Sequence, residues 1–468
     1  QDRKNQTPTA GLPSTLVDHT KGTVLGQLAD ILIRNAVVVT VNPDFEIIEN
    51  GAVAIKDGRI DSVGSDGAGN PAGARHVIDA CGGIVMPGLV NTHTHLPMSL
   101  FRGLADDLAL DKWLTSHIFP AEAAHVHPDT VQAATLLSCA EMLLSGTTAC
   151  CDGYFYENFV AEAVAKAGIR ALLGQGVIDF PAPDCPDPEK NIDTAQAFVD
   201  QWKSKNARII PSIFCHSPYT CSAKTLQRAK QAADKAGVIF QIHVAETRNE
   251  SENAGIGQNR SVAAYLADLG VLGPNTLASH CVWLSSEDIV IFQETGTKVS
   301  HNPESNMKLA SGIAPVPAMR AAGICAGLGT DGCASNNNLD MFETMGFAAK
   351  LHKAAAMDPT VMDAETVVRM ATIQGAESLG LGQLIGSVEP GKAADLIVID
   401  TRQTHLCPLY HPESHLVYAV RGADVSHVLV DGQLLVERGR LVHMDVTAVM
   451  AEVSRIGQKV VKTDKHQQ

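Results

Sequence analysis

Several kinds of segment that define whole classes of protein are missing from this chain. No apolar run reaches the roughly 18 to 20 residues that a membrane-spanning helix needs, so we expect no membrane partner. No long basic run offsets the formal charge of −15, which repels phosphate backbones, so we expect no nucleic acid partner. Residues 1–27 are polar and lack the apolar core of a signal peptide, which predicts a loose N-terminal tail.

Cysteine pairs and aromatic residues are scarce as well. Aromatic residues make up 4% of the chain, and the eleven cysteines include no CxxC pair. Cysteines this dilute do not form a disulfide scaffold, so we expect a reduced, cytoplasmic protein. Hydrophobic residues reach 45% over 468 residues, which is ample for one large domain and an accessory one.

Three common catalytic signatures are also absent. The chain has no GxSxG elbow, and "LGLGQLIG" near residue 380 lacks the GxGxxG spacing after a strand. The HxE and PCxxC signature of the smaller cytidine-type zinc deaminases is missing too. These absences argue against serine-nucleophile hydrolases, dinucleotide enzymes and that deaminase class.

What the chain does contain is a regular alternation between residues 84 and 332, within a barrel domain predicted for residues 84–388. Apolar, β-branched runs alternate with segments of helical periodicity, one of which starts at Ser222, a plausible N-cap. Eight such runs predict a (β/α)8 barrel of the TIM type, in which strand ends carry the chemistry. The runs cover residues 84–95, 147–155, 169–179, 207–219, 237–247, 275–284, 297–306 and 324–332.

The segments on both sides of the predicted barrel have a different sequence pattern. Residues 28–83 and 389–445 contain short β runs broken by Asp-Gly and Gly-Gly turns. Neither set is long enough for a robust sheet of its own, so we expect both termini to form one small β-sandwich domain. Residues 446–468 are predicted to be a C-terminal helix and tail.

A metal site is predicted by histidines at strand ends. In a strand His93 and His95 face the same way, whereas on a helix they would diverge by about 200°. One HxH pair is a weak signal, because strand-end histidines often hydrogen-bond to loops, but His243 and Asp331 end two other runs. Three imidazoles and a carboxylate suit zinc, or ferrous iron, and leave room for a water.

Two further residues are catalytic candidates. Glu246 follows His243 by three residues, just past the strand end, where its carboxylate can reach a substrate. His280 ends the next run. Each alone is equally well explained as a hydrogen-bonded loop residue, but beside a metal site both become candidates.

The order of the motifs resembles a known family. "NTHTH", "IHVAET", "SHCVWL", "SHNPESNMKLASGIAPV" and "GTDGCASNN" are similar to motifs of the amidohydrolase superfamily, in its methylthioadenosine/S-adenosylhomocysteine deaminase branch. The resemblance spans about residues 31–445 and implies a distorted barrel, a composite β-sandwich and a homo-oligomer. It also implies one zinc or iron ion, because "SIFCHSPYTCS" lacks the lysine of binuclear relatives. The implied ligands are His93, His95, His243 and Asp331.

The resemblance further implies hydrolytic deamination of an aminopurine nucleoside to the inosine analogue and ammonia. Glu246 would protonate a ring nitrogen, and such acid–base help is worth about 100- to 10,000-fold. His280 would orient the water and stabilise developing negative charge. Asp331 would pass the proton of the water to the leaving ammonia.

Substrate contacts carry over from the same resemblance. Glu122 in "HIFPAE" resembles a residue that accepts hydrogen bonds from ribose hydroxyls, and His216 one that contacts purine or ribose. Trp113 resembles a pocket wall, and Ser335 a group that hydrogen-bonds the purine. Each of these residues also has an alternative interpretation. Glu122 could be a surface residue, His216 a structural residue, Trp113 a core residue and Ser335 a helix cap.

The chain departs from the branch after the third strand. Members that favour S-adenosylhomocysteine place an arginine there, whereas this chain has Gln175 followed by an acidic loop, residues 179–191. Losing a charge-assisted hydrogen bond costs about 1.5 to 3 kcal/mol, or roughly 10- to 150-fold in affinity. We therefore predict that 5′-methylthioadenosine or adenosine is preferred over S-adenosylhomocysteine.

Two alternative functions compete with this interpretation. The superfamily also includes guanine, 8-oxoguanine and cytosine deaminases and triazine hydrolases, whose substrates have no ribose diol for Glu122 to bind. A metal-free structural or signalling relative is the second alternative. Against it, all four ligand positions, Glu246 and His280 are intact.

Overall fold

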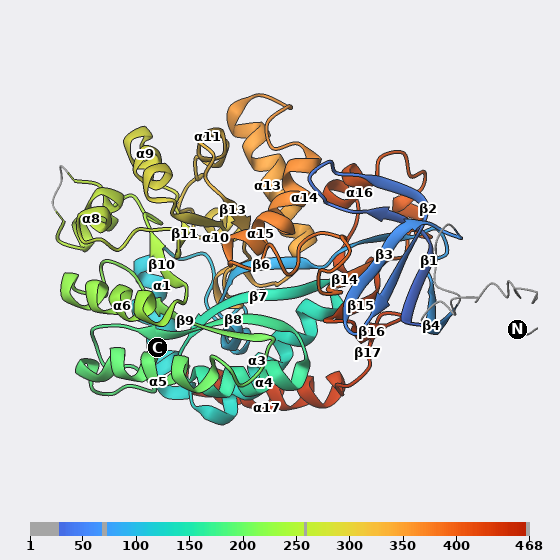
Figure 1. Cartoon of the computed structure of the whole chain (residues 1–468). Helices are drawn as coiled ribbons and strands as arrows, with labels where there is room; N and C mark the ends of the chain where they lie inside the picture. The colour runs from blue at the N-terminus through green and yellow to red at the C-terminus, as the bar shows by residue number, and fades with distance from the viewer. Residues whose placement is uncertain (1–27, 68–72, 257–259, 465–468) are drawn as a thin grey trace, which may run out of the picture.

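Eight parallel strands form a nearly closed barrel in the computed structural model, which describes residues 28–67, 73–256 and 260–464 (Figure 1). Each predicted run supplies one strand of the barrel, so the predicted barrel is confirmed. The tail predicted for residues 1–27 lies outside the described residues. The barrel strands are β6 (Leu89–Thr94), β7 (Thr147–Tyr154), β8 (Arg170–Val177), β9 (Ile209–Cys215), β10 (Phe240–Val244), β11 (Thr276–His280), β12 (Lys298–His301) and β13 (Ala326–Leu328).

Hydrogen bonds outside the strand ladders connect the first and last strands of the barrel. The backbone N–H of Asp331 donates to the carbonyl of His93 at 2.9 Å. The side-chain amide of Asn91 donates to the Thr330 hydroxyl at 2.7 Å. These bonds place Asp331, from the end of the chain's last barrel strand, directly beside the histidines of the first.

Helices surround these strands, and their buried faces follow the predicted periodicity. In α6 (Ala223–Ala236) the Ser222 hydroxyl accepts from the Thr225 N–H, as its predicted N-cap role requires, and Leu226 faces the core. The other outer helices are α3 (Pro128–Leu144), α4 (Glu157–Ala167), α5 (Asn191–Trp202), α8 (Val262–Asp268), α9 (Ser286–Thr295), α11 (Val316–Ala321), α13 (Met341–Ala356), α14 (Ala364–Ala371) and α15 (Ile373–Ser378). Among the residues described, no helix combines the length and apolarity needed to cross a membrane.

Short helices follow several strands at the end of the barrel that carries the site. They bring extra side chains over the strand ends, which is where barrel chemistry is expected. These elements are η1 (Leu96–Phe101), α1 (Leu110–Trp113), η2 (Leu114–Ile118), α2 (Phe119–His125), α7 (Glu250–Asn253), α10 (Pro303–Lys308) and α12 (Cys333–Asn336).

Both termini build a second, separate sheet, as predicted (Figure 1). Its hydrogen bonds connect nine strands continuously, because β1 pairs with β4 over Ala29–Arg34 and with β5 at Val37 and Val38. The antiparallel pair of β5 and β14 joins the two ends of the chain. The strands are β1 (Ala29–Val39), β2 (Ile47–Lys56), β3 (Arg59–Ser65), β4 (Ala74–Asp79), β5 (Ile84–Pro87), β14 (Leu396–Ile399), β15 (Val425–Val430), β16 (Gln433–Glu437) and β17 (Arg440–Leu441).

The run predicted as the first barrel strand in fact divides at Gly88. Its first half, β5, belongs to the terminal sheet, and its second half, β6, belongs to the barrel. A Cβ atom on Gly88 would lie 2.0 Å from the hydroxyl oxygen of Thr148, so only glycine allows this close passage between the sheets.

Two further contacts hold the termini against the barrel. Arg170 of β8 is 2% exposed and binds the Asp395 carboxylate through two nitrogens, at 2.8 and 3.0 Å. The C-terminal helix α17 (Val446–Asp464) packs on α3. One more helix, α16 (Pro412–Tyr418), lies between β14 and β15 in the chain.

Candidate active site

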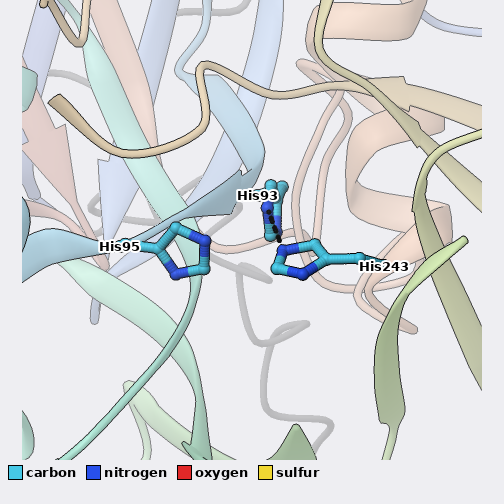
Figure 2. Close-up of side chains that lie close together, drawn as sticks. All are labelled: His93, His95 and His243. Atoms are coloured by element: carbon cyan, nitrogen blue, oxygen red, sulfur yellow. Dashed lines mark hydrogen bonds between the residues drawn. The ribbon is translucent and has the colours of Figure 1, made fainter. Parts of the chain in front are cut away.

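The four predicted metal ligands converge at the strand ends, and Figure 2 shows the three histidines among them. His93 and His95 come from the end of β6, and their imidazoles face that of His243 from β10. The Nε2 atoms of His93 and His243 lie 3.1 Å apart. Oδ1 of Asp331 lies 3.4 Å from Nε2 of His93 and 3.3 Å from Nε2 of His95. Four potential donor atoms therefore surround one point.

The imidazoles are held in the form that binds a metal. Burial lowers the pKa of His93 to about 4 and lowers the pKa of His243 well below its usual value, so both rings are neutral at pH 7. Nδ1 of His95 lies 2.6 Å from the carbonyl oxygen of Gly153, which fixes the proton on Nδ1 and leaves Nε2 with its lone pair.

Asp331 is held as an oriented carboxylate. Burial alone would raise its pKa, but the hydrogen bond with His93 and the nearby imidazoles bring the pKa well below the usual value. Its Oδ2 atom accepts from the hydroxyls of Ser305 and Ser335, both at 2.7 Å. Oδ1, which accepts from the Gly332 N–H at 2.8 Å, is the oxygen that faces the histidines.

This donor set fits a single zinc ion. Neutral imidazole nitrogens and a carboxylate oxygen match the ligand preference of zinc. Potential donor atoms of His93, His280 and Asp331 also lie within 4.8 Å of one another, so His280 borders the same point. The assignment of individual ligands stays a prediction.

Glu246 and His280 flank the cluster. The Glu246 carboxylate lies 3.9 Å from Nε2 of His280, and both residues are buried. Burial raises the pKa of Glu246, which favours the protonated form. Burial alone would lower the pKa of His280, but the charges of Glu246 and Asp331 raise it above its usual value. Glu246 can therefore release a proton, and His280 is favoured in its positively charged form.

The backbone at two of these residues is left-handed. His280 and Asp331 have φ angles of 71° and 65°, in a region where histidine and aspartate are enriched among residues other than glycine. Glu250 accepts hydrogen bonds from the N–H groups of Ala245 and Glu246, at 3.0 and 2.8 Å, which fixes the loop that carries Glu246.

Three connected cavities meet at the cluster. The metal cavity has a volume of about 50 Å³, and three of the four predicted ligands line it. Its lining includes His95, His243, Asp331, Trp113, Glu246, His280 and Ser335. The apolar chamber, of about 280 Å³, shares His95 and His216 with it and contains Glu122. The charged opening, of about 780 Å³, shares Glu246 with the metal cavity.

Four of the five predicted substrate contacts line these cavities. Glu122, on α2, accepts a hydrogen bond from the Tyr154 hydroxyl. Burial raises the pKa of Glu122 to about 7, against the opposite effect of Tyr154. Burial lowers the pKa of His216 to about 3, so its ring is neutral. Trp113 lines the metal cavity and donates to the Ala105 carbonyl at 3.0 Å.

The structure does not bring the fifth predicted contact, Gln175, into any of the three cavities. Its side chain donates to Asp184 at 2.8 Å, whereas Gly176 and Val177 line the apolar chamber. Ser335 does line the metal cavity, but its hydroxyl donates to Asp331. Both side chains therefore make structural hydrogen bonds, and their predicted contacts with substrate stay untested.

Several residues of the site were not assigned a role from the sequence. Tyr154 holds Glu122, and Asn306 Oδ1 lies 2.9 Å from Nδ1 of His280. Ser305 donates to Asp331. Ser305 and Asn306 belong to the motif "SHNPESNMKLASGIAPV". The motif marked this segment as part of the family resemblance, but it did not indicate which side chains the two residues bind.

A barrel with three imidazoles and a carboxylate at its strand ends defines a metal-dependent hydrolase. The match to the amidohydrolase family covers residues 84–435, and the chain belongs to this family. Family membership and the relatives below make it a hydrolase of carbon–nitrogen bonds in cyclic amidines.

Known proteins resemble this chain along nearly its whole length. It is 47% identical to the 5-methylthioadenosine/S-adenosylhomocysteine deaminase of Syntrophobacter fumaroxidans, covering 92% of this chain and 98% of that protein. It is 44% identical to the 5′-deoxyadenosine deaminase of Methanosarcina acetivorans, covering 93% and 99%. A zinc-bound adenosine deaminase from Xanthomonas campestris superposes with a TM-score of 0.90 at 37% identity, covering 93% and 100%.

Proposed function

We propose that the chain deaminates adenine nucleosides with uncharged 5′ groups to the inosine analogues and ammonia. Its substrates would be 5′-methylthioadenosine, 5′-deoxyadenosine or adenosine. The observation that carries the proposal is the position of Glu122, a buried carboxylate in a chamber that opens directly onto the ligand cluster. A carboxylate there can accept hydrogen bonds from both hydroxyls of a ribose diol.

The residues around the cluster support this chemistry. Zinc, held by His93, His95, His243 and Asp331, would supply an activated water by lowering its pKa from about 15.7 to about 7. Glu246, whose pKa burial raises, delivers a proton to the ring nitrogen next to the reacting carbon. His280, whose pKa its acidic neighbours raise, donates from Nε2 and stabilises the negative charge that develops on oxygen.

Asp331 completes the proton path. Two serine hydroxyls and a backbone N–H fix its carboxylate, and Oδ1 faces the cluster. In this position the Asp331 carboxylate would take a proton from the attacking water and pass it to the departing amine. His216, neutral and lining both the metal cavity and the apolar chamber, lies where purine and ribose would meet.

Replacing Glu122 with alanine tests the nucleoside assignment against a free base or triazine. A hydrogen bond to a charged group is worth about 1.5 to 3 kcal/mol, so kcat/KM for adenosine should fall at least 10- to 150-fold. The same substitution should have little effect on 2′,3′-dideoxyadenosine, which lacks the diol. Unchanged adenosine kinetics in Glu122→Ala, with zinc still bound, would instead favour the free-base or triazine alternative.

The pKa of Glu122 predicts how substrate affinity depends on pH. Because burial raises this pKa to about 7, the carboxyl group is protonated below that pH and loses acceptor capacity. KM for adenosine should therefore rise as the pH falls through 7. In Tyr154→Phe the hydrogen bond that lowers the pKa is gone, so the rise should begin at a higher pH. A KM profile identical in both proteins contradicts this role of Glu122.

Three other expectations remain proposals. We propose a cytoplasmic location, which agrees with the absence of disulfides among the described residues. We also propose a homo-oligomer, which light scattering of the purified protein can test. The proposed domains are residues 28–83 with 389–445, residues 84–388, and residues 446–468.

A further inference from the structure

The apolar chamber extends beyond Glu122, away from the ligand cluster. Its outer wall combines Phe119 of α2 and Phe155 with a proline-rich part of the loop after β8. The loop residues that line it are Ile178, Phe180, Pro181, Ala182 and Pro183. Among the described residues that line it, none is lysine, arginine or aspartate, and Glu122 is the one acidic side chain. A group bound past Glu122 therefore meets an apolar surface.

An aromatic contact closes the outer end of this chamber. The rings of Phe119 and Phe180 meet edge to face, with centroids 5.9 Å apart and an angle of 64°. Phe180 is 38% exposed, so it stands between the chamber and solvent. The contact links α2 to the loop after β8, two segments far apart in the sequence.

The loop that carries Phe180 is held in shape by its own hydrogen bonds. Asp184 accepts from the Gln175 side chain at 2.8 Å and from the Tyr156 N–H at 2.6 Å. Ala182 and Cys185 exchange backbone hydrogen bonds at 3.1 and 3.2 Å. The apolar wall is thus preformed, which lowers the entropic cost of binding a group against it.

The charged opening on the other side of the cluster has the opposite character. Its lining includes Asp107, Asp111, Arg248, Glu250 and Lys308. Glu122 lines the apolar chamber but neither the metal cavity nor the charged opening. A ribose bound by Glu122 therefore lies in the chamber, and its 5′ group continues along the apolar wall.

We propose that the apolar chamber is a subsite for apolar 5′ substituents larger than methylthio, with Phe180 as its specificity-determining residue. The chain would then also deaminate 5′-alkylthio adenosines with longer alkyl groups. This inference rests on the proposed nucleoside deamination. Each buried methylene should increase kcat/KM about fourfold, the fold-change that corresponds to about 0.8 kcal/mol. A charged amino acid group would meet no partner there, and its desolvation would lower affinity.

A substrate series on the zinc-loaded enzyme tests the proposal. Steady-state kcat/KM is measured for adenosine and its 5′-methylthio, 5′-ethylthio and 5′-butylthio derivatives, and for S-adenosylhomocysteine. We expect a rise along the alkyl series and the lowest value for S-adenosylhomocysteine. A flat or falling series, or the highest value for S-adenosylhomocysteine, overturns the subsite. Failure of the proposed function looks different, because then adenosine itself is not deaminated.

Variants of Phe180 test its part in specificity. Phe180→Arg introduces a cation into the chamber wall, so it should reduce the preference for butylthio over S-adenosylhomocysteine at least tenfold. Phe180→Leu, which stays apolar, should keep the wild-type order of substrates. Arg248→Ala, in the charged opening, is the second control and should also keep that order. If this preference falls less than tenfold in Phe180→Arg, with an unfolding temperature close to wild type, Phe180 is removed from the proposal.

Discussion

Replacing His243 with alanine should remove zinc and reduce deamination to an undetectable level. His243 supplies one of the imidazoles that surround the predicted ion, and its Nε2 lies 3.1 Å from that of His93. The activation of water by zinc amounts to nearly 9 pKa units, or roughly 12 kcal/mol at about 1.36 kcal/mol per unit. No other group in the site offers a comparable contribution.

Zinc content and kcat/KM for adenosine, measured on the same preparation, check this expectation. A matched control is available, because residues 125–127 repeat the His-x-His spacing outside the cluster. His125→Ala should retain both zinc and activity. If His243→Ala kept full turnover, the ligand assignment would be wrong.

Replacing Glu246 with glutamine should lower kcat by about 100- to 10,000-fold, the usual contribution of a positioned acid–base group. Glutamine has nearly the same shape but cannot release a proton from an acid. Because Glu246 is predicted to act on the substrate, zinc content should stay at the wild-type level. A large loss of kcat with the metal retained is the result that separates this role from that of a ligand.

The control for this variant is Glu252→Gln, an exposed glutamate of α7, six residues along the chain. It should leave kcat unchanged. A decrease of less than tenfold in Glu246→Gln would show that proton delivery comes from another group.

Much of the fold could be predicted from the sequence, because the barrel strands have a strong local pattern of hydrophobicity. Each strand is a short apolar run, and polar residues follow it where the chain reaches the open end. The division at Gly88 was not readable, because β5 and β6 are both fully buried and no change in polarity marks the boundary.

The convergence of the predicted ligands could be expected for the same reason, since they sit at strand ends whose positions follow from the pattern. The hydrogen bond of Gln175 to Asp184 could not be expected, because β8 is buried on both faces and its sequence does not reveal which side chains point toward the site. Tyr154, Ser305 and Asn306 act through partners far along the chain, so local pattern carries no sign of their bonds.

The buried pair of Arg170 and Asp395 makes the two sheets inseparable as folding units. Replacing Asp395 with alanine would leave a guanidinium group enclosed without its main counter-charge. Removing one partner of such a pair costs about 3 to 5 kcal/mol, a large part of the roughly 5 to 15 kcal/mol that stabilises an ordinary protein. An excised barrel would therefore be a poor scaffold for catalysis, although every predicted catalytic side chain lies within it.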